Sequence, residues 1–246
     1  MTVGMGRREE IASALTRVRA RLDAACRDAG REPGAVALLP VTKFFPASDV
    51  RVLYDLGCRE FGESREPEAS QKVADFTADP GVTESVHWHM IGRLQRNKVK
   101  SVVRWADTIH SLDSERLADA VSAAVDAATD AGERSGPVEM LIQVSLDGDP
   151  SRGGVPVEDL EALADRVACA PGLELGGLMA VPPLGADPDA AFAQLHAVHA
   201  DLVRVHPGAT TLSAGMTGDL ESAVRHGSTC VRVGTALLGS RPIVSK

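Results

Sequence analysis

The chain has 246 residues, 44% of them hydrophobic and 24% charged, with a formal net charge of −8 when histidine is taken as neutral. This length suits one large α/β barrel or two small domains, and the acidic balance argues against the broad positive field that draws proteins to nucleic acid or anionic membranes. Aromatic residues make up only 3%, so we expect an aliphatic core, which suits an α/β layered structure.

The first predicted element is a helix over residues 8–29, where Ile11, Leu15, Val18 and Leu22 recur at helical spacing and Gly30 ends it. After it, short apolar runs alternate with longer amphipathic ones. Strands are expected at 36–41, 59–62, 86–91, 108–111, 138–145, 173–181, 211–213 and 229–233. Helices are expected at 48–57, 65–78, 95–105, 114–132, 156–169, 187–204 and 218–226, with a short closing turn at 234–239.

Strict alternation of strands and helices predicts a parallel sheet, and eight strands in this length predict a (β/α)8 TIM-type barrel with an extra N-terminal helix. We expect this single domain to span residues 1–246. The alternative, an open doubly wound sheet, lacks a G-x-G-x-x-G sequence after the first strand. Pro40 removes a hydrogen-bond donor from the first strand, which suggests a β-bulge there.

Other patterns indicate a reduced, cytoplasmic protein. The four cysteines (Cys26, Cys58, Cys169 and Cys230) are scattered without a C-x-x-C pair. No apolar run approaches the ~20 residues of a membrane span, and the N-terminus lacks the apolar segment of a secretory signal. His87 and His89 alternate on one strand without further ligands beside them, so no metal is expected.

Two surface features have alternative interpretations. The basic cluster Arg93, Arg96, Lys98 and Lys100 is interpreted as a solvated helix start, because no aromatic residues interleave with it for base stacking. Arg152 lies in a glycine-rich loop at 148–154, which forms either a mobile lid over the barrel mouth or a simple flexible connection.

Lys43 is the first candidate for chemistry. Side chains alternate along a strand, so Ala37, Leu39, Val41 and Lys43 share one face. If that face is the barrel interior, Lys43 lies at the C-terminal mouth, where active sites of this fold are found. A partly desolvated lysine there is nucleophilic toward carbonyl groups, whereas the alternative is a solvated lysine at a strand end.

The second candidate site follows the last two strands. In this fold the loops after strands seven and eight often bind phosphate. Gly234 permits close backbone approach to an anion, and Ser213 and Thr235 add hydroxyl donors. Arg232 shares the interior face with Gly234 and needs an acceptor, either a carboxylate such as Glu63 or a ligand atom.

These motifs together resemble the pyridoxal phosphate homeostasis protein family, whose fold is similar to the N-terminal barrel of bacterial alanine racemase. The resemblance runs from about Ile11 to Gly239. The pieces that carry it are LPVTKFFP (39–46), FGE (61–63), WHMIGRLQRNK (88–98), IHSLD (109–113), LIQV (141–144), GLM (177–179) and residues 212–239, which include RHGSTCVRVGTALLG (225–239).

The resemblance implies that pyridoxal 5′-phosphate (PLP) is the cofactor, held as a Schiff base on Lys43. It implies that Ser213, Gly234 and Thr235 hold the phosphate and that Arg232 faces the ring nitrogen. The remaining expected cofactor contacts are Ser64, His89, Gly215 and Met216. Ser64 stands where the family usually has asparagine, and the usual LSMGMS reads LSAGMT here, which keeps a hydroxyl at Thr217.

Two functions follow from this site: PLP homeostasis and delivery, with transient contact to PLP-dependent apo-enzymes, or a PLP-dependent amino-acid racemase of low activity. Racemisation needs a base on each face of the substrate. In the racemases that this barrel resembles, the second base is a tyrosine from a further domain of the partner subunit. Here the chain ends with the barrel, and its single tyrosine, Tyr54, falls in a predicted helix. An arginine at the ring nitrogen weakens the ring as an electron sink, which disfavours transamination or decarboxylation, although racemases tolerate it. We therefore favour the carrier, mainly because the second domain is missing. We expect a monomer, because racemases dimerise through that domain.

Overall fold

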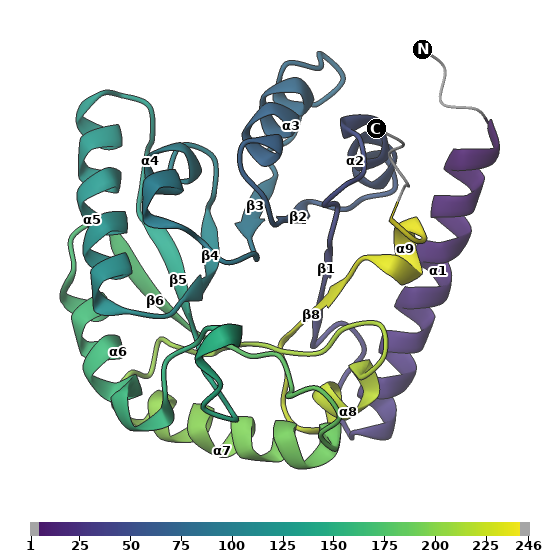
Figure 1. Ribbon diagram of the computed structural model, residues 1–246. Helices are drawn as coiled ribbons and strands as arrows, with labels where there is room; N and C mark the ends of the chain where they lie inside the picture. Colours follow the sequence, from purple (N-terminus) through teal and green to yellow (C-terminus); the bar gives the residue numbers. More distant parts are fainter. Residues whose placement is uncertain (1–4, 242–246) are drawn as a thin grey trace.

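The computed structural model describes residues 5–241, in which eight parallel strands form one sheet surrounded by helices (Figure 1). The strand order is β1-β8-β7-β6-β5-β4-β3-β2, and a bridge between Val41 and Gly62 joins the two outer strands. The predicted (β/α)8 barrel is therefore confirmed. The strands are β1 (Ala37–Pro40), β2 (Glu60–Glu63), β3 (His87–Met90), β4 (Thr108–Leu112), β5 (Val138–Gln143), β6 (Leu173–Met179), β7 (Thr211–Ser213) and β8 (Cys230–Val233).

The helices follow the predicted order with shifted ends. They are α1 (Met5–Asp28), α2 (Ala47–Asp55), α3 (Glu68–Thr77), α4 (Val99–Val102), α5 (Glu115–Asp130), α6 (Leu160–Cys169), α7 (Pro188–Val205), α8 (Leu220–Arg225) and α9 (Thr235–Leu238). The helix predicted at 95–105 is the largest difference, because it consists of a 3-10 turn at Arg96–Lys98 followed by the short α4. None of the described helices is long and apolar enough to cross a membrane.

The extra N-terminal helix α1 packs against α8 and α9, next to the segments that follow β7 and β8. Its apolar face, Ile11 to Leu22, is buried. On its polar side, Arg21 donates to the Thr217 carbonyl oxygen at 2.8 Å, and Arg7 donates to the Leu238 carbonyl oxygen at 3.0 Å. These bonds fix the segments after β7 and β8, where the phosphate site is predicted.

The bulge suggested at Pro40 does not form, because β1 pairs with β8 in unbroken register and Pro40 lies opposite Val233. Val41 donates its N–H to β8, and Thr42 donates its N–H to Gly62 of β2. By alternation, the missing donor of Pro40 faces β2, where β1 forms only the single bridge. Proline is thus accommodated at the β1–β2 seam, where a single bridge joins the two strands.

Candidate functional site

A cavity of about 290 Å³ opens at the carboxyl ends of the strands. The β1–α2, β7–α8 and β8–α9 connections form its walls, and the predicted residues Lys43, Met216, Arg232, Gly234 and Thr235 all line it. Phe44, Thr217 and Arg241 are further lining residues. Leu39 and Val41 are buried beneath Lys43, whereas Lys43 itself is exposed rather than partly desolvated, since it lies beyond the end of β1.

A second cavity of about 390 Å³ lies on the β2 side of Lys43. Lys43, Phe44 and Phe45 belong to both cavities. Phe44 adopts a left-handed backbone conformation, φ 67°, and Arg241 lies over its ring with the guanidinium carbon 4.2 Å from the centroid. Lys43 and Phe44 therefore lie between the two cavities and line both, and Lys43 is exposed.

Arg232 is buried, with only 5% of its surface exposed, and it donates to two neutral acceptors. Nη1 lies 2.6 Å from Ser213 Oγ and Nη2 lies 3.0 Å from the Ala180 carbonyl oxygen. Glu63, the carboxylate that was one of the two alternative partners, pairs instead with Lys72, at 2.6 Å. Burial lowers the pKa of Arg232, and no ion pair compensates its charge within residues 5–241.

The Arg232 contact begins a chain of polar side chains across the barrel interior. Ser213 Oγ lies 3.0 Å from His110 Nδ1, and His110 Nε2 lies 3.0 Å from His89 Nδ1. Because arginine only donates, Ser213 accepts from Arg232. When Ser213 gives its own proton to His110, His110 donates from Nε2 to His89. This order assigns the proton of His89 to Nε2, a buried atom without a partner in the described part of the chain.

The two histidines in this series of hydrogen bonds, His89 and His110, are held neutral. Burial lowers the pKa of His89 to about 4 and lowers that of His110 well below its usual value. A neutral imidazole offers one donor and one acceptor, which is what a directional chain from Arg232 requires. The interior of the barrel thus orients the Arg232 guanidinium without a carboxylate.

The other predicted contacts lie around the cavity rather than in its wall. Ser213 is fully buried beneath it, and the half-buried His89 is linked to Ser213 through His110. Gly215 has φ 92°, and its carbonyl oxygen accepts from the Arg232 N–H at 2.9 Å. The Ser64 carbonyl packs closely against Gly92, so this residue joins the β2 and β3 loops.

Sequence reasoning missed Lys72 and the role of His110. Lys72 lies in an amphipathic helix where a solvated lysine is the ordinary expectation, so its sequence gives no signal. His110 lies inside the IHSLD motif, on a strand whose five residues are all buried, and its place between Ile109 and Leu112 was an available sign of an interior polar contact.

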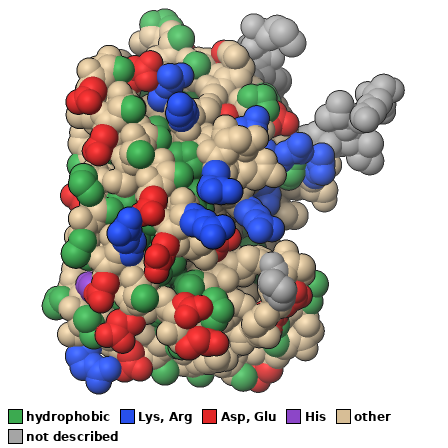
Figure 2. All heavy atoms as spheres, turned by 60° about the vertical axis from the view of Figure 1, so that its left-hand side comes forward, with side chains coloured by type: hydrophobic (Ala, Val, Ile, Leu, Met, Phe, Trp, Pro, Cys, Tyr) green, Lys and Arg blue, Asp and Glu red, His purple; other side chains and the backbone are tan. Residues whose placement is uncertain are grey.

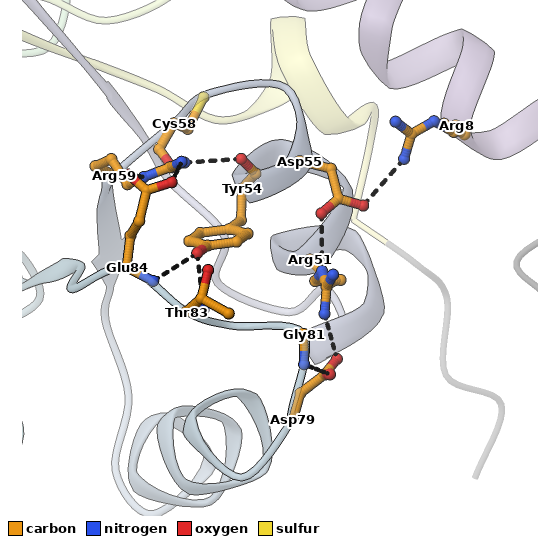
Figure 3. Close-up of polar contacts among 10 residues, drawn as sticks. All are labelled: Arg8, Arg51, Tyr54, Asp55, Cys58, Arg59, Asp79, Gly81, Thr83 and Glu84. Atoms are coloured by element: carbon orange, nitrogen blue, oxygen red, sulfur yellow. Dashed lines mark hydrogen bonds and ion pairs between the residues drawn. The ribbon is translucent and has the colours of Figure 1, made fainter.

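Tyr54 lines neither of the two cavities beside Lys43, so it is not placed as the second base of a racemase. It is buried in α2, and its hydroxyl oxygen accepts the backbone N–H groups of Thr83 and Glu84, at 3.0 and 2.9 Å (Figure 3). The Arg59 guanidinium lies over its ring at 4.2 Å. Tyr54 therefore fastens the α3–β3 loop to α2.

Charge is unevenly distributed on the surface despite the net negative balance. On the face drawn in Figure 2, Lys and Arg side chains gather near the middle, while Asp and Glu gather over its lower part. Arg93, Arg96 and Lys100 of the sequence cluster are exposed, in agreement with a solvated segment. Among residues 5–241, no group of three or more His, Cys, Asp or Glu side chains is placed to hold a metal ion.

Known proteins resemble this chain over nearly its whole length. The family described as alanine racemase, N-terminal domain, matches residues 14–242. The pyridoxal phosphate homeostasis protein of Mycobacterium leprae is 54% identical over 241 residues, which cover 95% of this chain and 93% of that protein. An unknown protein from Bifidobacterium adolescentis has a crystal structure with a TM-score of 0.87 and 32% identity, covering 96% of this chain and 97% of its own.

PipY from Synechococcus elongatus, in a structure with PLP bound, is 32% identical with a TM-score of 0.76, and the match covers 93% of this chain and 100% of PipY. These matches confirm the resemblance that the motifs indicate. The chain belongs to the pyridoxal phosphate homeostasis protein family, within the larger family of alanine racemase N-terminal domains.

Proposed function

We propose that this protein binds PLP as a Schiff base on Lys43 and acts in intracellular PLP homeostasis and delivery. The observation that carries the proposal is the shared cavity: an exposed lysine amine and a buried arginine without a carboxylate partner line it together with Gly234 and Thr235. When bound, PLP supplies an aldehyde that condenses reversibly with an amine. The PLP-bound structure of PipY supports the same ligand here.

The residues present fit this ligand at both of its polar ends. Gly234 and the hydroxyl-bearing Thr235 and Thr217 all line the cavity, and glycine backbone and hydroxyl donors suit a phosphate. Arg232 uses Nη1 and Nη2 for protein acceptors, and within residues 5–241 its Nε donates to none. We assign Nε–H, at the cavity wall, to the pyridine nitrogen. Ser213 then acts by orienting Arg232.

Delivery is favoured over racemisation. A racemase needs a second base opposite the lysine, and Tyr54 is buried in α2 with its hydroxyl oxygen accepting two backbone N–H groups. Because Lys43 is exposed and lines both cavities, it would hold the cofactor where an incoming amine or water can reach it. We propose that transient contact with PLP-dependent apo-enzymes uses this open mouth.

The test is a spectroscopic titration of the ligand-free protein with PLP, followed by transfer. We expect a visible absorption band in the unmodified protein and in Lys100→Ala, and none in Lys43→Ala. The loaded protein should then activate a PLP-dependent apo-enzyme and should not convert L-alanine to the D-enantiomer. A band that persists in Lys43→Ala contradicts the binding site, and sustained production of D-alanine contradicts the carrier function.

A further inference from the structure

A buried cluster of three polar side chains lies directly behind Lys43. Thr42 Oγ1 donates to Glu63 Oε1 at 2.5 Å, and Lys72 Nζ donates to the same oxygen at 2.6 Å. Lys72 also donates to the Thr42 carbonyl oxygen at 2.8 Å. The Lys72 and Glu63 side chains are only 10% and 3% exposed. The peptide group that joins Thr42 to Lys43 is therefore held by a hydrogen bond from the buried ammonium group of Lys72 on α3.

The cluster lies at the seam of the barrel. β1 and β2 are joined by the Val41–Gly62 bridge, with the Thr42 N–H donating to the Gly62 carbonyl oxygen at 2.9 Å. Pro40 offers no donor on this side. The Thr42–Glu63–Lys72 contacts thus add the side-chain bonds that the ladder lacks, at the residue before Lys43, where the backbone turns into the left-handed Phe44.

The cluster also sets the charge that faces the Lys43 amine. Lys43 shares the second cavity with Glu63 and Lys72, and with the exposed Arg65 and Glu68. On its other side lie Arg232 and Arg241. Burial raises the pKa of Glu63. The positive charges of Lys72 and, to a smaller extent, Lys43 act in the opposite direction and lower it. Glu63 is therefore a buried acid that contacts Lys72 directly and shares a cavity with Lys43.

We propose that Lys72 is a positioning residue for Lys43: it holds the Thr42 carbonyl oxygen and neutralises the Glu63 carboxylate, so that the Lys43 amine is not drawn into an ion pair and stays reactive toward an aldehyde. That Lys43 uses this reactivity to bind PLP rests on the proposed function. The reactivity of the Lys43 amine itself does not rest on it, and it is measured without PLP.

The experiment is trace acetylation of the ligand-free full chain with acetic anhydride at fixed, mildly alkaline pH. The rate at Lys43 is quantified by peptide mass spectrometry relative to the exposed Lys100 in the same sample. Glu63→Gln removes a negative charge beside Lys43, which should raise its relative rate about threefold to tenfold. Lys72→Met leaves Glu63 uncompensated and should lower the rate by a similar factor. The double variant should lie within about twofold of the unmodified protein.

Opposite shifts that cancel in the double variant support the proposal, because a loss of structure moves both single variants in the same direction. Equal shifts, or none, overturn it. If Lys72→Met does not fold, Glu63→Gln decides alone: a faster Lys43 supports the proposal and an unchanged Lys43 overturns it. Lys98→Met, a basic residue outside both cavities, is the matched control and should leave the Lys43 rate unchanged. Failure of PLP to bind contradicts the proposed function and leaves this result standing.

Discussion

Arg232 Nη1 lies 2.6 Å from Ser213 Oγ, so the two side chains share a hydrogen bond inside the barrel, beneath the cavity that contains Lys43. Family resemblance assigns Ser213 to the phosphate, whereas its burial assigns it to Arg232. The two roles are separable by experiment, since one concerns ligand affinity and the other concerns the folded protein itself.

Ser213→Ala should lower the free energy of unfolding of the ligand-free protein by about 1–3 kcal/mol, because it leaves Arg232 and His110 each short of a buried partner. Urea denaturation measures this, with the exposed Ser85→Ala as a control that changes stability by less than about 0.5 kcal/mol. A variant that keeps full stability but loses PLP affinity would assign Ser213 to the phosphate after all.

The two interior histidines predict a loss of stability in acid. Burial lowers the pKa of His89 to about 4 and that of His110 well below its usual value, whereas an unfolded histidine titrates near ~6.5. The unfolded chain thus binds more protons in this window. The contribution is fully present above pH ~6.5 and is lost as the pH falls toward ~4.

His89→Asn isolates this effect from the titration of carboxylates. Between pH 7 and pH 5 the unmodified protein should lose about 2 kcal/mol more stability than the variant. Urea denaturation at the two pH values gives the difference. An identical loss in both proteins would mean that His89 does not titrate between the folded and unfolded states as described.

Gly177 of the GLM motif should tolerate no side chain. Its φ is 146°, and a Cβ atom there would overlap the Thr211 carbonyl oxygen of the neighbouring strand. We expect Gly177→Ala to cost about 3 kcal/mol or more, or to prevent folding. Gly132→Ala is the matched control, because its φ is also positive, 69°, but open space surrounds it; it should cost about 1–2 kcal/mol. Equal effects on melting temperature would contradict this account.

Arg152 fastens the β5–α6 loop to the β6–α7 loop. Its guanidinium donates to the Pro182 carbonyl oxygen at 2.6 Å and to Asp147 at 3.0 Å. Arg152→Ala should speed amide hydrogen exchange in segments 145–155 and 181–187 while the barrel strands stay protected. Hydrogen exchange is measured by mass spectrometry, and unchanged protection of both loops in the variant would contradict the fastening role. Fast exchange at residues 148–154 would agree with a mobile lid.

The barrel, its order of elements and the residues at its mouth were predictable, because strand alternation and the C-terminal location of active sites are properties of local sequence and fold. The partner of Glu63, in contrast, was not predictable. Its place after a strand made it a reasonable partner for Arg232, but α3 brings Lys72 to it. Which of two cations reaches a buried acid depends on how a helix packs on the sheet, and periodicity does not encode that. Pro40 is a similar case, since only the closed barrel shows which side of β1 lacks a partner.

The central claim, attachment of PLP to Lys43, is tested most directly by borohydride reduction of the PLP-loaded protein and peptide mapping. Two lysines line the second cavity, so the measurement distinguishes them. We predict one pyridoxyl group, on the peptide that contains Lys43, with the visible band bleached and no label in Lys43→Ala. A pyridoxyl group on Lys72, or none on either lysine, would contradict the account.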